Sequence, residues 1–227
     1  STSPYTLTSK NVQVLKVMFE LAHSLGGSLG TSWYLLLRTF QQVDVFLAIA
    51  QESAGGPSDA RWPRARSESQ NAGPAAASPH PPDSELEQLA SWMAGVFDTT
   101  KSLDDDALLA LINALINLST DSLGAAQSPD TPAQTSPSTS LHANLAQRQK
   151  MFGCNKLVEV TSINIGRIAL YADLVHSYFL SVILSNRDPF ARQTAVESVA
   201  MVIQTFLAPE AQSPTAPADG GRAGEAD

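Results

Sequence analysis

The stretch LTSKNVQVLKVMFELAHSLGGSLGTSWYLLL, residues 7–37, decides the fold class because it contains a helix, a glycine-rich joint and a second helix. Apolar side chains recur three and four positions apart on both sides of the joint, which predicts amphipathic helices. Ser9 is a suitable N-cap for the first helix, and Gly26 and Gly27 supply the positive φ that ends it. A joint this short predicts that the two helices pack antiparallel.

The same helical pattern returns twice, separated by segments rich in Pro, Ser, Ala and Gln that hold too few apolar side chains to offset the entropy of ordering. This alternation predicts six regions. The helical regions within 1–50 and 83–207 are expected to form one solenoid. The regions are a first helical hairpin at 1–50, a disordered linker at 51–82, a second helical hairpin at 83–118, a disordered linker at 119–140, a third helical block at 141–207 and a disordered acidic tail at 208–227.

The third block ends in a helix whose start is marked by Asp188, a good N-cap, and by Pro189 at the first helical position. Earlier in the block, Gly153 is expected to separate a short helix from one that begins at Asn155. Small and apolar positions follow Asp188 and Arg192 in a HEAT-like pattern, at Ala195 and Val199. The predicted fold is therefore all-α, a degenerate armadillo/HEAT-like α-solenoid of helical hairpins with disordered linkers.

Composition argues against binding to nucleic acid or anionic lipid, against an extracellular protein and against a membrane span. The net charge is −8, which disfavours non-specific binding to nucleic acid and to anionic lipid. The single cysteine cannot form an internal disulfide, so we expect an intracellular protein. The first residue is Ser1, and we expect a piece of a longer protein or a processed product. The longest apolar run, 163–184, is interrupted by polar residues, so no transmembrane segment is predicted.

No motif predicts a catalytic, cofactor or metal site, and we expect no enzymatic activity and no cofactor. The acids at 104–106 open a helix, where they complement the positive end of its dipole. Four histidines lack the spacing of metal ligands: His23, His80, His142 and His176.

Two features carry alternatives. Cys154 is typical of a small buried side chain, and the alternative is a thiol enzyme in which it acts with His142 or His176. The basic cluster at 61–66 is typical of a solvated linker or regulatory segment, and the alternative is a partner-docking peptide.

Three stretches together carry a family resemblance. The first is LTSKNVQ followed by LAHSLGGSLGTSW, within 7–33, which contains a helix entry, a turn and a second helix start. The second is LDDDALLALINALINLS at 103–119. The third is FGCNKLVEVTSINIGRI at 152–168, followed by the NRDP hairpin at 186–189. These stretches resemble the Mon-two family of large Golgi and endosome scaffolds, which is related to the large Sec-seven-type Arf exchange factors.

The resemblance implies a non-catalytic helical-repeat scaffold in vesicle-mediated protein transport that acts through protein–protein contacts. It implies protein partners such as Arf-like small GTPases and other large trafficking scaffolds, with no nucleic acid. The expected location is cytoplasmic, at trans-Golgi network and endosome membranes, with peripheral association through partners. The alternative is a regulatory helical region of a large Arf exchange factor whose catalytic domain lies outside this chain.

Overall fold

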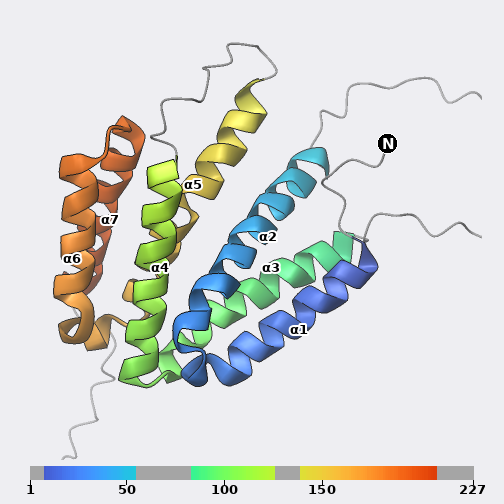
Figure 1. The fold of residues 1–227 in the computed structure, drawn as a ribbon, viewed down its shortest axis with the longest axis horizontal. Helices are drawn as coiled ribbons and strands as arrows, with labels where there is room; N and C mark the ends of the chain where they lie inside the picture. Colours follow the sequence, from blue (N-terminus) through green and yellow to red (C-terminus); the bar gives the residue numbers. More distant parts are fainter. Residues whose placement is uncertain (1–7, 55–82, 126–138, 209–227) are drawn as a thin grey trace, which may run out of the picture.

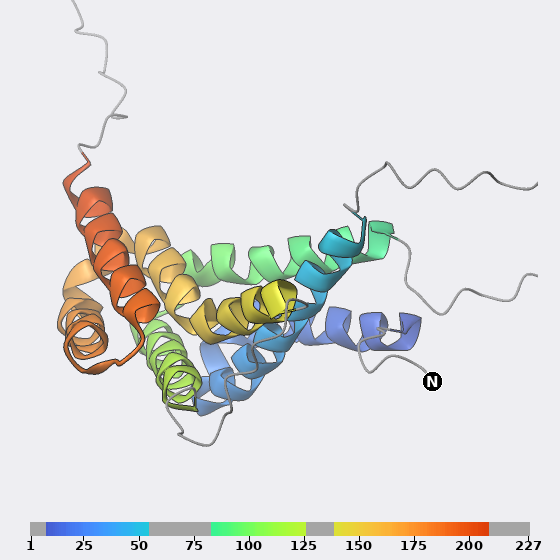
Figure 2. The same ribbon diagram turned by 90° about the horizontal axis from the view of Figure 1, so that it is seen from above.

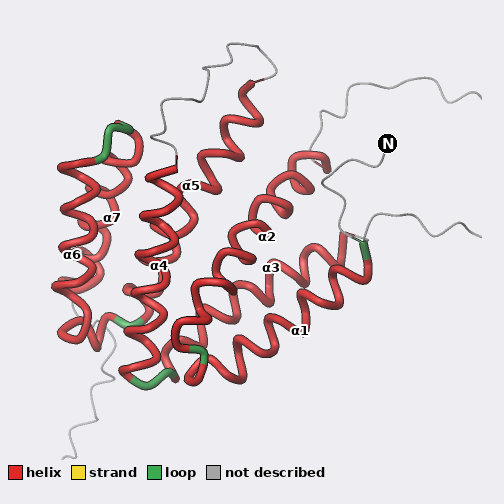
Figure 3. Tube along the Cα trace, viewed as in Figure 1, coloured by secondary structure: helices red, strands yellow, loops and turns green. Residues whose placement is uncertain are grey.

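The fold is built from helices alone in the part of the chain that the computed structural model describes, residues 8–54, 83–125 and 139–208. Figure 3 shows no strand in these ranges, which confirms the predicted all-α class. The α-helices are α1 (Ser9–Leu25), α2 (Trp33–Ala54), α3 (Asp83–Asp98), α4 (Asp105–Ala125), α5 (Thr139–Ile163), α6 (Ile168–Ser185) and α7 (Pro189–Leu207), with short 3₁₀ turns η1 (Gly26–Ser28), η2 (Gly30–Ser32), η3 (Thr99–Ser102) and η4 (Ile165–Arg167).

The predicted linkers and tail fall mostly outside the described residues, so their disorder stays a prediction. Where the bounds can be compared, α4 is longer than expected: it continues to Ala125 instead of ending near residue 118. The reason is that the added turns belong to the core, because Ser119 and Leu123 are both buried. Helix α2 likewise continues to Ala54.

The first two helices diverge from their joint and do not pack along their lengths as expected (Figure 1). Helix α3 contacts both of them and α1 packs chiefly against it, while α2 packs against α4 and α5. Close to the joint the rings of Phe19 and Phe40 stack, with centroids 4.8 Å apart. The connection through η1 and η2 is therefore a corner, and each helix finds its main partner elsewhere in the chain.

The C-terminal half consists of closely packed neighbours. Helix α4 packs most extensively on α5, α6 packs on α7, and α5 also contacts α7. Figure 2 shows α1 and the α6–α7 pair at opposite ends of the molecule, as Figure 1 does. One continuous apolar core runs between these ends, with Trp33, Phe40, Phe97, Tyr171 and Phe179 among its largest buried side chains.

The joint between α1 and α2 is made differently from the prediction. Thr8, not Ser9, is the N-cap of α1, and its hydroxyl accepts from the Asn11 amide at 3.3 Å. Gly26 has ordinary right-handed backbone angles, and the positive φ falls at Gly30, at 47°. Gly26 is needed for space instead, because an added Cβ would lie 3.3 Å from the Trp33 ring.

Helix α5 runs unbroken through Gly153, where the sequence predicted an interruption. The glycine permits a close crossing of α4: a Cβ added there would lie 2.9 Å from the backbone nitrogen of Ser119. Real Cβ atoms do not approach other atoms so closely. Gly153 therefore marks a helix–helix contact, and it does not end a helix.

The start of α7 agrees with the prediction. Asp188 is its N-cap and accepts from the Phe190 amide at 2.9 Å, and Pro189 occupies the first turn. Lys150 of α5 forms an ion pair with the same carboxylate. Burial alone would raise the pKa of Asp188, but the hydrogen bonds from Lys150 and from the Phe190 amide outweigh it and hold that pKa below its usual value.

Two stretches, Asp105–Gly124 and Ile165–Ser185, are long and apolar enough to cross a membrane by length and composition, contrary to the expectation that none would be. Half of the first stretch is buried inside the fold, where it forms the central helix α4. The second is 28% buried, because one face of α6 packs on α4 and α7 and the other is open. Core helices of globular folds meet the same two criteria.

Candidate interaction surfaces

The acidic run that opens α4 has a structural role. The Asp104 carboxylate accepts from the Ala107 amide at 2.7 Å, and Asp105 and Asp106 lie in the first turn. His23 lies in the last turn of α1, and His176 is exposed on α6. Among the described side chains, no three of His, Cys, Asp or Glu are grouped as a metal site requires.

The other sequence candidates lie outside what the structure describes. These are His80, the side chain of His142 and the basic cluster at 61–66. The idea of a partner-docking peptide at 61–66 therefore stays a hypothesis, as does any pairing of His142 with the thiol.

Cys154 lies in the interior of the fold and not at a helix N-terminus. It sits in the middle of α5, is 1% exposed, and its Sγ is 3.8 Å from the Ser198 hydroxyl on α7. Burial raises the pKa of the thiol to about 11, although the hydrogen bond with Ser198 lowers it. The thiol is therefore neutral at pH 7, which suits a packing residue better than a nucleophile.

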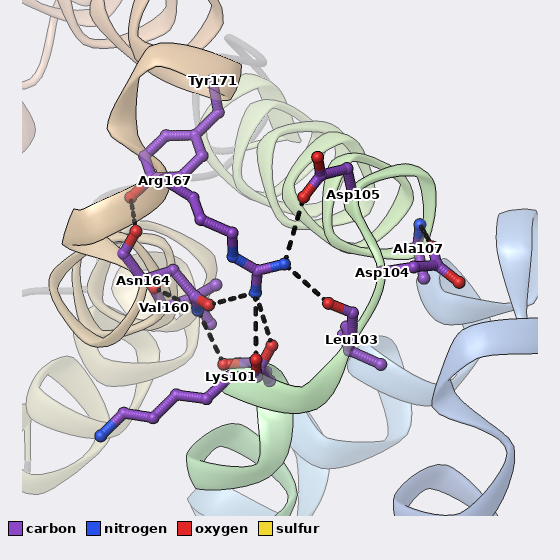
Figure 4. Close-up of polar contacts among 10 residues, drawn as sticks. Lys101, Leu103, Asp104, Asp105, Ala107, Val160, Asn164, Arg167 and Tyr171 are labelled. Carbon is purple, nitrogen blue, oxygen red and sulfur yellow. Dashed lines mark hydrogen bonds and ion pairs between the residues drawn. The ribbon is translucent and has the colours of Figure 1, made fainter.

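A cluster of polar side chains joins two turns at the same end of the helices (Figure 4). We call it the polar clasp, and its members are Thr100, Asn164, Arg167 and Tyr171. The Arg167 guanidinium donates to the Leu103 carbonyl at 2.6 Å and to the Thr100 carbonyl at 3.1 Å. It also donates to the Asn164 side-chain oxygen at 2.6 Å. One side chain of the α5–α6 turn thus satisfies carbonyls of the α3–α4 turn.

The rest of the polar clasp is buried. Asn164 donates to the Thr100 hydroxyl at 2.9 Å, and both side chains are shielded from solvent. The Tyr171 hydroxyl donates to the Thr161 and Asn164 carbonyls at 2.9 and 2.8 Å. Burial raises the pKa of Tyr171 to about 12, although the positive charge of Arg167 lowers it. The tyrosine therefore stays a donor at neutral pH, and the clasp holds two successive turns together.

Replacing Arg167 with methionine is expected to lower the free energy of unfolding by about 1–2 kcal/mol, because carbonyls of the α3–α4 turn lose their donor. Methionine keeps most of the apolar stem, so packing changes little. Urea unfolding followed by circular dichroism measures the loss. Arg187→Met is the matched control, since Arg187 is exposed, and should stay within about 0.5 kcal/mol of the parent. Equal losses in the two variants would contradict a clasp at Arg167.

A hollow of about 710 Å³ lies between α2, α4 and α5. We name it the polar groove, and it is lined by Tyr34, Arg38, Gln41 and Gln42 of α2, Leu118, Asp121 and Ser122 of α4, and Ala143, Ala146, Gln147, Gln149 and Lys150 of α5. Four of these twelve residues are glutamines, two are cations and one is a carboxylate. Such a lining can exchange several hydrogen bonds with the backbone of a partner protein.

Fixed hydrogen bonds hold the walls of the polar groove. The Tyr34 hydroxyl donates to Asp121 at 2.6 Å, and this bond raises the pKa of Tyr34. Gln41 is buried and donates to the Gln149 carbonyl at 2.7 Å. Two donors are left over: the Gln147 side-chain nitrogen is buried without a partner, and exposed Arg38 has no ion-pair partner among the described residues. Of these two donors, only the Arg38 guanidinium is open to an incoming acceptor.

A second, smaller hollow of about 150 Å³ runs between α6 and α7. We name it the apolar end groove, and it is lined by Ile168, Tyr171, Ala172, Val175, His176, Phe179, Val199, Val202 and Ile203. Apart from His176 and the hydroxyl of Tyr171, the side chains that line this groove are apolar. Its chemistry is therefore that of a helix–helix interface.

The polar groove was not predicted from the sequence, because its residues come from helices that lie far apart in the chain. Tyr34 and Asp121 are 87 positions apart, and Gln41 and Gln149 are 108 apart. The clasp left a partial signal: Arg167 and Asn164 belong to the third family-like stretch, and Leu103 begins the second. The structure brings these two stretches into contact.

Comparison with known proteins finds relatives along most of the chain. It is 29% identical over 205 residues to Protein MON2 homolog of Drosophila melanogaster, which covers 90% of this chain and 11% of the relative. It is 28% identical over 201 residues to Protein MON2 homolog of Homo sapiens, which covers 88% and 10%. The protein of the same name from Xenopus laevis is 28% identical over 164 residues.

The chain therefore spans about a tenth of the length of these relatives. No family model matches it. No solved structure matches it either.

Proposed function

Because the chain belongs to the Mon-two family, we propose that it is a non-catalytic segment of a large scaffold in Golgi and endosome vesicle-mediated protein transport. The observation that carries the proposal is relatedness along nine-tenths of the chain to proteins of that family. The segment acts through protein–protein contacts and needs no cofactor. It works in the cytoplasm, at trans-Golgi network and endosome membranes, where partners hold it.

We propose that the segment is part of a degenerate armadillo/HEAT-like solenoid. In support, α4–α5 and α6–α7 are packed pairs, and α5 of the first contacts α7 of the second. The polar clasp adds a polar tie between successive turns through Arg167. Helices α1 to α3 depart from a regular stack, since α3 contacts both α1 and α2. The repeat is therefore irregular at this end.

The non-catalytic part of the proposal is supported by the state of the one cysteine. A nucleophilic thiol needs access and a low pKa, and Cys154 is 1% exposed with its pKa raised to about 11. Its hydrogen-bond partner is the Ser198 hydroxyl, which is not a general base at neutral pH. We propose that Cys154 serves only to pack α5 against α7.

We propose the polar groove as the surface on which a protein partner docks, with Arf-like small GTPases as the partner class. The groove has fixed walls, an exposed donor without an ion-pair partner at Arg38, and a mostly uncharged lining. Docking of this kind uses hydrogen bonds to a partner's backbone and acidic side chains. The acidic charge of the whole chain makes nucleic acid a poor alternative.

The test is a pull-down of the full-length protein on immobilised Arf-like GTPases loaded with a GTP analogue or with GDP. We expect retention on one nucleotide form, and at least a fivefold loss of retention for Arg38→Glu. Arg187→Glu, an equal charge change on the exposed α6–α7 turn, is the control and should be retained like the parent. No retention on either form would refute the GTPase partner. Equal retention of Arg38→Glu and Arg187→Glu would mean that the partner docks somewhere other than the polar groove.

A further inference from the structure

Helix α7 has two apolar faces, of which only one is covered. Its inner face, with Ala191 and Ala195, is fully buried. On the outer face Val196, Ile203 and Leu207 recur at intervals of seven and four, which places them in one stripe. These three side chains are 52%, 50% and 68% exposed. A helix that is apolar on two faces normally lies between two layers.

The open stripe continues into the apolar end groove. Ile203 belongs to both, and Val199 and Val202 of α7 face Ala172 and Phe179 of α6 across the hollow. The groove and the stripe therefore form one apolar surface that extends over the outer side of the α6–α7 pair. A contiguous surface of this kind is uncommon on a protein that is covered only by water.

The opposite end of the molecule carries a similar surface. On α1, Phe19 and Leu15 are buried, whereas Val14, Val17, Leu21 and Leu25 are each about half exposed or more. Val14, Val17 and Leu21 lie three and four positions apart, so they form one stripe. Figures 1 and 2 both place α1 and α7 at opposite ends of the stack. Both end helices therefore present to solvent the kind of face that the inner helices bury.

We propose that the outer face of α6–α7 is covered by an amphipathic helical pair from another part of the same long polypeptide. The proposal rests on the solenoid that we propose above, because each repeat of a solenoid buries its faces against its neighbours. The length of the relatives supports this occupant: this chain matches 11% of the Drosophila protein, so in a polypeptide of that length most residues lie outside the matched segment. The apolar end groove is then an internal joint, and partners bind elsewhere.

Other occupants fit the face less well. A lipid surface attracts basic residues, but Arg192 beside the stripe is accompanied by exposed Glu197 and Asp173, and the chain carries a net charge of −8. Head-to-tail contacts between copies, with α7 on α1, are heterologous and build open filaments unless the rotation closes a ring. A helical pair of the same polypeptide covers the apolar face without needing a basic surface and without building filaments.

The test compares hydrogen exchange of α7 in this 227-residue chain and in the full-length natural protein. We expect the α7 amides to exchange at least tenfold more slowly in the full-length protein, because a covering layer suppresses opening of the helix. The double variant V196E/I203E in the full-length protein should return exchange to the rate of the short chain. Q204E is the control, since Gln204 is an exposed polar residue off the apolar stripe, and should leave exchange slow.

Two results would overturn the proposal. Equal α7 exchange in the short and full-length proteins would mean that no other part of the polypeptide covers the face. A 227-residue chain that is dimeric by light scattering, and becomes monomeric as V196E/I203E, would assign the face to a second copy. Both results are independent of GTPase retention, so this proposal and the partner proposal can fail separately.

Discussion

Replacing Trp33 with alanine is expected to lower the free energy of unfolding by about 3–5 kcal/mol, as truncation of a large buried aromatic side chain does. The indole is 1% exposed and belongs to the continuous core. Its ring nitrogen donates to the Gly26 carbonyl at 3.2 Å across the joint between α1 and α2. Truncation therefore removes apolar packing, leaves a cavity, and leaves a buried carbonyl without its donor.

Urea unfolding followed by circular dichroism at 222 nm measures this loss without relying on tryptophan fluorescence. Leu35→Ala is the control: it removes an apolar side chain two positions away that is 67% exposed, and should cost less than about 0.5 kcal/mol. Trp33→Phe keeps an aromatic ring but lacks the N–H donor, so its loss should lie between the two. A loss below about 1 kcal/mol for Trp33→Ala would contradict a packed indole.

The local features of the fold were predictable from the sequence. Helical periodicity identified faces that the structure buries, including Val12, Leu15 and Phe19 on α1. Short-range chemistry also identified the start of α7, because an N-cap and a first-turn proline act within four residues of each other at Asp188 and Pro189. Such signals need no knowledge of the rest of the chain.

The choice of packing partners was not predictable in the same way. A short joint implied that α1 and α2 pack against each other, but α3, which begins more than fifty residues after α1 ends, packs against both. The apolar stripe of α1 fits α3 or α2 equally well as a pattern. Which one it meets depends on the corner at Gly30, whose φ of 47° redirects the chain, and on the volumes of the side chains around it.

The candidate sites show the same limit. The polar clasp depends on Arg167 reaching carbonyls some 64 residues earlier, and carbonyls carry no sequence signal. That the Gln147 side-chain nitrogen is buried without a partner can be recognised only once α2, α4 and α5 are placed around it. A sequence without a recognisable catalytic motif can therefore still form defined surface grooves, and only the packing shows where they lie.

Gly153 is the position at which the local sequence pattern and the packing disagree, and the disagreement can be tested. A glycine inside a helix costs about 1 kcal/mol relative to alanine, so Gly153→Ala would stabilise a helix that had no neighbour there. In the structure the new Cβ would lie 2.9 Å from the Ser119 nitrogen and 3.1 Å from its Cα, which are backbone atoms of α4. The two helices must move apart, and overpacking of this kind typically costs about 1–3 kcal/mol.

We therefore expect Gly153→Ala to lower the free energy of unfolding by about 2 kcal/mol, with urea unfolding as the measurement. Gly95→Ala in α3 is the matched control, because nothing lies within 4 Å of a Cβ added there and the change should stabilise by up to about 1 kcal/mol. Opposite signs for this substitution in the two helices are the result that the contact with Ser119 predicts. Stabilisation by both variants would mean that α4 and α5 do not cross at Gly153.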